Sequence, residues 1–231
     1  MSDYEHIFFD LDRTLWDFET NSHETLSELI QKHKLPEKGI ESASDFITEY
    51  LIINEQLWDE YRKGDVDKNT LRYDRFYRTL LKFKIDDRLL SQAIGNDYVI
   101  TSPLKTGLFP HTKEVLDYLN ANYNLHIITN GFEEVQHVKI KNCGIEKYFD
   151  QVITSERAGF KKPDVRIFEY SLATVNCNAT NSLMIGDSLE ADIIGARNAG
   201  IHQVYFNPKK EPHSEDVTFE ISSLKELINF L

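Results

Sequence analysis

Two aspartates near the start of the chain have the types and spacing for covalent chemistry. Asp10 and Asp12 lie two residues apart in the segment DLDRT, directly after a short apolar run. A carboxylate can attack a phosphate ester and form an aspartyl-phosphate. A second carboxylic acid beside it can give a proton to the leaving oxygen and later take one from water. The pair alone could equally be two solvated acids at the end of a strand, so its interpretation depends on other residues.

Attack by a carboxylate on a phosphate ester requires positive charge nearby, and the sequence offers two sources. Asp187, in the segment GDS, can join Asp10 in binding a hard cation such as Mg²⁺. Lys162, in the segment KKPD, is expected at the start of a helix because Pro163 suits the first helical turn. A cation is unfavourable at that end of a helix, so Lys162 indicates another purpose.

Two further groups of polar residues have alternative interpretations. Asp192, five residues after Asp187, could support the metal site from behind, or it could be an acid stabilised at a helix N-terminus. Thr129, Asn130 and Gly131 could bind phosphate oxygens through a hydroxyl, an amide and backbone N–H groups. The segment TNG by itself is also a common turn, so it adds weight only beside the others.

These residues need a scaffold that brings distant parts of the chain together. Short apolar runs predict buried strands at residues 5–10, 125–129, 151–154, 183–187 and 202–206. Helical periodicity predicts helices at residues 111–121, 164–175 and 189–199. The alternation of the two indicates an α/β fold with a doubly wound parallel sheet. Because ligands bind at the carboxyl ends of such strands, the candidate residues are expected to meet at one edge of the sheet.

A long helical stretch interrupts this alternation. Residues 19–100 show helical periodicity, with three expected helices and no convincing strand. The simplest interpretation is an inserted helical domain. The sequence therefore predicts a core domain formed by residues 1–18 and 101–231, and a helical domain formed by residues 19–100.

Composition limits the classes of function. Hydrophobic residues make up 41% of the 231 residues and charged residues 28%, as in soluble globular proteins. The net charge of −12 disfavours a nucleic-acid partner. The two cysteines have no metal-ligand spacing, and the N-terminal segment resembles neither a signal peptide nor a membrane helix. A cytoplasmic protein with no membrane partner is expected. The oligomeric state is not predicted.

The four polar segments, in this order, resemble the motifs of the haloacid dehalogenase (HAD) superfamily. DLDRTL is similar to its first motif, ITNG to its second, KKPD to its third and GDSLEAD to its fourth. The similarity covers residues 1–15 and about 103–207. It implies a Rossmann-like HAD core and the activity of a magnesium-dependent phosphatase.

The resemblance also implies a role for each matching residue. Asp10 would be the nucleophile and Asp12 the general acid and base. Thr129 would bind phosphate, and Lys162 would steady both the nucleophile and the phosphoryl group. Mg²⁺ would be held by Asp10, the backbone carbonyl of Asp12 and Asp187.

The 19–100 stretch resembles the helical cap that one class of this family inserts after the first motif. Its segment NEQLW, followed by Tyr61 and Gly64, is similar to the branch of pyrimidine 5′-nucleotidases, as is ITNGF in the core. Asn54, Trp58 and Tyr61 recur at helical spacing, so they could offer stacking and hydrogen bonds to a nucleotide base. Trp58 and Tyr61 could instead be core residues of the cap, and both interpretations stay open.

The preferred function is a 5′-nucleotidase acting on pyrimidine nucleoside monophosphates. One alternative is a phosphatase or phosphomutase acting on another small phosphorylated metabolite, such as a sugar phosphate. A dehalogenase is disfavoured because Asp12 supplies a proton that displacement of a halide does not need. A non-catalytic phosphate-binding protein is disfavoured because Asp10, Asp12, Lys162 and Asp187 are all present.

Overall fold

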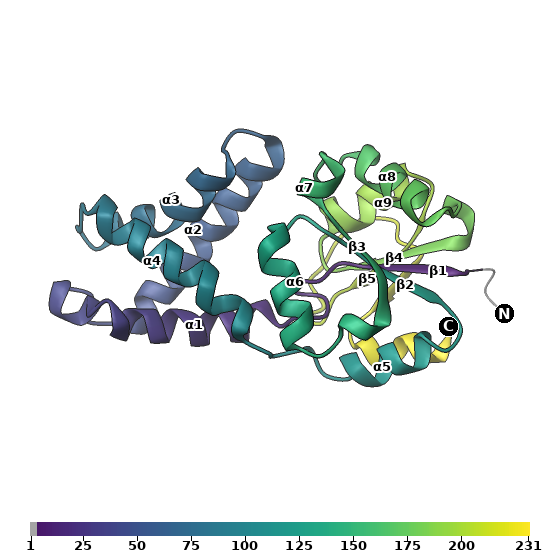
Figure 1. Cartoon of the computed structure of the whole chain (residues 1–231), viewed down its shortest axis with the longest axis horizontal. Helices are drawn as coiled ribbons and strands as arrows, with labels where there is room; N and C mark the ends of the chain where they lie inside the picture. The colour runs from purple at the N-terminus through teal and green to yellow at the C-terminus, as the bar shows by residue number, and fades with distance from the viewer. Residues whose placement is uncertain (1–3) are drawn as a thin grey trace. The chain divides into compact units, whose positions relative to one another are not determined.

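The computed structural model describes residues 4–231 (Figure 1). They form two compact units, one from the residues up to Phe18 together with Thr106–Leu231, and the other from Glu19–Lys105. The boundary predicted after residue 100 falls inside the last helix of the second unit, α4 (Arg88–Thr101). The second unit extends to Lys105, whose ammonium pairs with Glu28 of the same unit.

A six-stranded sheet forms the centre of the first unit, with the strand order β3-β2-β1-β4-β5-β6. Every neighbouring pair is parallel, which confirms the predicted sheet. The strands are β1 (His6–Phe9), β2 (Asn124–Thr129), β3 (Phe149–Thr154), β4 (Ser182–Gly186), β5 (His202–Phe206) and β6 (Phe219–Ile221). The sequence does not predict β6, because this strand has three residues and only Ile221 is buried.

Helices cover both faces of the sheet. Successive strand residues point to opposite faces, so each strand contributes side chains to two cores. Ile7 and Phe9 pack in one core with α5 (Thr112–Leu119) and α6 (Glu133–Asn142). Phe8 packs in the other core with α8 (Val165–Val175) and α9 (Gly195–Asn198). A short helix α7 (Ser155–Ala158) follows β3, and a π-helical segment (Leu189–Ile194) precedes α9. The 3-10 helices of this unit are Glu146–Tyr148, Ala179–Asn181 and Leu224–Asn229.

The second unit is entirely helical in its regular structure and has its own core. Its helices are α1 (Phe18–Lys32, which begins at the unit boundary), α2 (Ala43–Lys63), α3 (Lys68–Lys82) and α4, with 3-10 helices at Leu35–Lys38 and Ser102–Leu104. Ser42, Asp67 and Asp87 accept backbone N–H bonds at the starts of α2, α3 and α4. Leu26, Phe46 and Phe76 are buried in a shared apolar cluster, which explains the predicted periodicity. No helix among residues 4–231 is both long enough and apolar enough to cross a membrane.

A histidine pair links β1 to β2 within the sheet. His6 Nδ1 and His126 Nε2 lie 3.0 Å apart, and the two rings are stacked. His126 is 2% exposed, and burial followed by the neighbouring His6 lowers its pKa to about 4. His126 therefore stays neutral in the folded protein under conditions where the unfolded chain binds a proton.

Acid is expected to destabilise the fold through His126. A histidine with a lowered folded-state pKa contributes stability above the unfolded value of 6.5, and this contribution is lost as the pH falls toward 4. Between about pH 7 and about pH 5, a His126→Leu variant should lose about 2 kcal/mol less unfolding free energy than the wild type. Urea titrations at several pH values would measure the difference. His23→Leu, at an exposed position of α1, should keep the wild-type slope, and an unchanged slope for His126→Leu would refute the assignment.

Candidate active site

The predicted polar residues meet at the carboxyl edge of three neighbouring strands. Asp10 follows β1, Thr129 ends β2 and Asp187 comes directly after β4. Since the strand order is β2-β1-β4, these ends are adjacent in the sheet although they are far apart in the sequence. Parallel strands deliver their carboxyl ends to the same edge, which is the usual place for a ligand in an open α/β sheet.

Lys162 occupies the centre of this site. Its Nζ donates hydrogen bonds to Asp10 Oδ1 at 2.6 Å, Asp192 Oδ1 at 2.6 Å and the backbone carbonyl of Ile128 at 2.8 Å. The side chain is 2% exposed, so all three ammonium hydrogens are satisfied inside the protein. The unfavourable place of this lysine before a helix is thus explained by two carboxylates that need its charge.

Asp192 supports the site from the π-helical segment. Its Oδ1 accepts the bond from Lys162, and its Oδ2 accepts a bond from the backbone N–H of Ser188 at 3.0 Å. A Cβ on Gly186 would lie 2.3 Å from Asp192 Oδ2, so glycine at this strand end leaves room for the carboxylate. Asp192 therefore does two things in the structure. It accepts a backbone N–H bond at the start of the π-helical segment, and it holds Lys162 in place.

The electrostatics of the site favour a bound cation. Asp10, Asp187 and Asp192 place carboxylate oxygens within 4.8 Å of one another. Burial raises the pKa of Asp10 to about 7, although Lys162 opposes the change. Burial, together with Asp10 and Asp192, raises the pKa of Asp187 well above its ordinary value.

This donor set fits a magnesium ion. Asp10 and Asp192 are buried and Asp187 is half-buried, and the charge of Lys162 alone does not balance these three carboxylates, whereas an added divalent cation would. Both oxygens of Asp192 already accept hydrogen bonds, which leaves Asp10 and Asp187 as the side chains best placed to hold the ion. Thr14 Oγ1 donates a hydrogen bond to Asp187 Oδ1 at 3.2 Å, which orients this carboxylate.

Asp12 is held by two residues of α6 that the sequence does not single out. Gln136 Nε2 donates to Asp12 Oδ2 at 2.8 Å, and Lys139 Nζ forms an ion pair with Asp12 Oδ1. The signal that could have revealed them is a polar pair, three residues apart, on the face of a helix that should be apolar.

The TNG segment is organised mainly by contacts within the protein. Thr129 Oγ1 accepts hydrogen bonds from the N–H of Gly131 at 3.0 Å and from Gln136 Nε2 at 3.3 Å, so its own hydroxyl hydrogen is left to donate. The Asn130 amide donates to the carbonyl of Lys162 at 2.9 Å and accepts from the Lys162 N–H at 2.8 Å. Asn130 thus positions Lys162, while its contact with a substrate stays a prediction.

Glycine occupies position 131 for a steric reason that the sequence does not reveal. A Cβ at this position would lie 1.4 Å from Gln136 Nε2, so glycine is required for the approach of Gln136 to Thr129. The predicted contact between Gly131 and phosphate is a separate matter and stays a prediction.

The three predicted base-binding residues differ in burial. Asn54 is buried in the helical unit, where its Oδ1 accepts hydrogen bonds from Arg75 at 3.2 Å and from Tyr50 at 3.5 Å. Tyr61 is also buried, and its ring meets that of the partly exposed Trp58 edge-on at 5.6 Å. Asn54 thus links α2 to α3 (Lys68–Lys82), Tyr61 is buried on α2, and contact of the three residues with a base stays a prediction.

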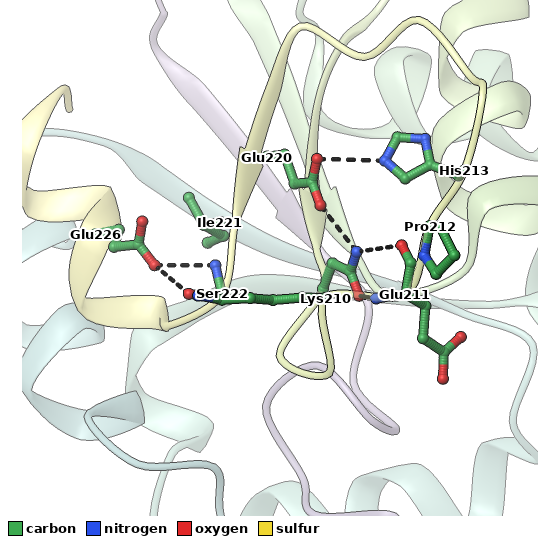
Figure 2. A pocket seen from close by; sticks show the side chains of 9 residues that line it. Lys210, Glu211, Pro212, His213, Glu220, Ile221, Ser222 and Glu226 are labelled. Carbon is green, nitrogen blue, oxygen red and sulfur yellow. Dashed lines mark hydrogen bonds and ion pairs between the residues drawn. The ribbon is translucent and has the colours of Figure 1, made fainter.

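A separate pocket lies at the carboxyl ends of β5 and β6 (Figure 2). Its volume is about 470 Å³. Glu220 accepts hydrogen bonds from Asn207 and His213, and Glu226 accepts them from the backbone and hydroxyl of Ser222. Its lining residues include none of the candidate catalytic residues.

The fold and the ordered site residues define a class of hydrolase. A family model of haloacid dehalogenase-like hydrolases matches residues 4–200, and the chain belongs to this family.

Relatives of this chain place it among the phosphatases of the family. It is 32% identical to the pyrimidine 5′-nucleotidase YjjG of Escherichia coli, over 99% of this chain and 98% of YjjG. It is 31% identical to a glyceraldehyde 3-phosphate phosphatase of Methanothermobacter thermautotrophicus, over 96% and 98%. The crystal structure of the magnesium-bound HAD-hydrolase YfnB from Bacillus subtilis superimposes with a TM-score of 0.90 at 26% identity, over 98% and 97%. The protein is a HAD-type phosphatase.

Proposed function

We propose that this enzyme is a magnesium-dependent phosphomonoesterase that works through an aspartyl-phosphate on Asp10, with pyrimidine nucleoside monophosphates as its substrates. The observation that carries the proposal is the buried contact of Asp10 with Lys162, beside Asp187 and at the same strand edge as Thr129. This arrangement combines a nucleophile, a fixed cation and a place for a metal ion.

The reaction has two steps. In the first, a carboxylate oxygen of Asp10 attacks phosphorus, the ester bond breaks, and Asp12 gives its proton to the leaving oxygen. In the second, Asp12 takes a proton from water, the water oxygen attacks phosphorus, and the Asp10 carboxylate is regenerated as inorganic phosphate leaves. Lys162 and the hydroxyl of Thr129 stabilise the negative charge in both steps.

A magnesium ion would supply additional positive charge. Asp10, the backbone carbonyl of Asp12 and Asp187 would hold it, and when bound it would neutralise charge between the nucleophile and the phosphoryl oxygens. The magnesium in the YfnB structure supports this assignment. Without the ion, burial keeps the pKa of Asp10 at about 7, so part of the nucleophile is protonated near neutral pH.

The choice of substrate rests on the relatives and on the helical unit. The similarity to YjjG extends over the whole chain, including the helical unit, and supports a pyrimidine nucleotide. The similarity to a glyceraldehyde 3-phosphate phosphatase is nearly as high and supports a small phosphorylated sugar as the second candidate. The free cysteines Cys143 and Cys177 suit a reducing compartment, which supports a cytoplasmic location for this enzyme.

The test compares UMP, dUMP, dTMP, glyceraldehyde 3-phosphate and p-nitrophenyl phosphate as substrates, each with Mg²⁺ and with EDTA. We expect the highest kcat/KM for a pyrimidine nucleotide and loss of turnover in EDTA, restored by Mg²⁺. Phosphate should appear in proportion to the substrate lost, which separates hydrolysis from phosphoryl transfer. Turnover that survives EDTA would overturn the magnesium dependence, and a preference for glyceraldehyde 3-phosphate would overturn the nucleotide assignment alone.

A further inference from the structure

Two side chains of α6 contact Asp12 and have no part in the reaction described above. Gln136 and Lys139 lie three residues apart, on the same face of the helix. They are 1% and 5% exposed, respectively, so both are buried polar groups in the layer between α6 and the sheet. Burial of an unpaired polar group destabilises the fold, so such groups are usually paired. Gln136 and Lys139 share one partner, Asp12.

The orientation of the Gln136 amide follows from its neighbours. Its Nε2 donates to Asp12 Oδ2 at 2.8 Å and to Thr129 Oγ1 at 3.3 Å. The opposite orientation would place the amide oxygen against the carboxylate of Asp12. In the observed orientation Oε1 is buried without a hydrogen-bond partner among residues 4–231. The protein tolerates this unpaired acceptor while both amide hydrogens are directed at Asp12 and Thr129.

Lys139 fixes the other oxygen of Asp12. Its Nζ pairs with Asp12 Oδ1 and lies 4.0 Å from the centre of the fully buried Trp16 ring. A cation held between a carboxylate and an aromatic face has little freedom to move. Each carboxylate oxygen of Asp12 is thus bound by a different residue of α6, which sets the plane of the carboxyl group.

We propose that Gln136 and Lys139 are positioning residues that hold Asp12 where it can exchange a proton with the leaving oxygen. This inference rests on the proposed function, in which Asp12 is the general acid and base. Proton transfer requires the acid to lie within hydrogen-bond reach of the leaving oxygen, so an untethered Asp12 would spend much of its time in unproductive orientations. A protonated Asp12 still accepts a hydrogen bond through its carbonyl oxygen, so one of the two contacts can persist throughout the cycle.

The test uses the dependence of the reaction on the leaving group. The alkoxide of a nucleotide or sugar phosphate needs a proton as it departs, whereas p-nitrophenolate leaves readily without one. In Lys139→Met and in Gln136→Met, kcat/KM for the best alkyl phosphate should fall by about 10²-fold, and kcat/KM for p-nitrophenyl phosphate by less than about 5-fold. The ratio of the two values does not depend on the fraction of folded enzyme.

Two comparisons make the result specific. Lys141→Met carries the same substitution at an exposed position of α6 and should leave the ratio unchanged. Lys139→Arg keeps the charge and should restore much of the ratio. Equal losses on both substrates, or no loss, would overturn the inference while leaving the phosphatase in place. A wild-type enzyme that cleaves no phosphate ester would instead overturn the proposed function.

Discussion

Replacing Asp10 with asparagine is expected to reduce phosphate release by about 10³-fold or more, as removal of a catalytic nucleophile does in other enzymes. The amide has nearly the same shape as the carboxylate, but it cannot form a stable acyl-phosphate. Its Oδ1 can still accept the hydrogen bond from Lys162, so the site keeps its geometry. The loss should therefore be one of chemistry and not of folding.

Stability measurements separate these two effects. Burial disfavours the charged form of Asp10, whose pKa is raised to about 7, so an uncharged asparagine should not lower the melting temperature in metal-free buffer. Asp150→Asn, at an exposed position of β3, serves as the matched control and should keep wild-type activity. Full activity of Asp10→Asn would remove Asp10 from the mechanism.

Replacing Lys162 with methionine is expected to lower both activity and stability. Without the ammonium, the carboxylates of Asp10 and Asp192 lose the cation that each contacts at 2.6 Å. Breaking a buried ion pair by removal of one partner costs about 3–5 kcal/mol, because the other charge is left uncompensated. If Lys162 stabilises the phosphoryl group as proposed, loss of its charge should also reduce kcat by about 10²-fold or more.

Magnesium should stabilise Lys162→Met more than it stabilises the wild type. An ion bound to the folded protein stabilises it by mass action, and it would also replace part of the missing positive charge. The increase in melting temperature on addition of Mg²⁺ should therefore be larger for Lys162→Met than for the wild type. Lys161→Met, one position earlier, should change activity and stability much less. A Lys162→Met protein as stable as the wild type would show that the three-carboxylate cluster does not depend on this lysine.

The sequence predicts the centre of the sheet well because β1, β2, β4 and β5 are buried on both faces. Such strands read as apolar runs, and a polar residue at the end of a run, such as Asp10 or Asp187, is conspicuous. The alternation of strands and helices then indicates that the strands are parallel, so their carboxyl ends share one edge of the sheet. The order of the strands is known only from the structure. Both features are visible as local patterns in the sequence, so the parallel sheet and the meeting of Asp10 and Asp187 at one edge can be predicted without the structure.

The supporting residues of the site cannot be predicted in the same way. Gln136 and Lys139 interrupt the apolar face of α6. The apolar periodicity of this segment is therefore weak, and neither residue stands out in the sequence. Asn130 binds the backbone of Lys162, a contact between distant segments that no local pattern encodes. The sequence predicts an ordinary helix over residues 189–199, whereas the structure has a π-helical segment at Leu189–Ile194, which carries Asp192, followed by α9.

The place of β1 in the sheet has a consequence for how the protein is made. β1 is synthesised before β2 and β4, the two strands with which it pairs, and more than 100 residues separate it from β2. The helical unit is made in between and has a core of its own, so it can fold while β1 still waits for its partners. Closing such long loops is slow, and the apolar residues of β1 are meanwhile open to aggregation. A helical unit that folds early shortens the flexible chain that must be closed between β1 and β2. It can therefore speed the pairing of these strands, which forms the carboxyl edge of the sheet.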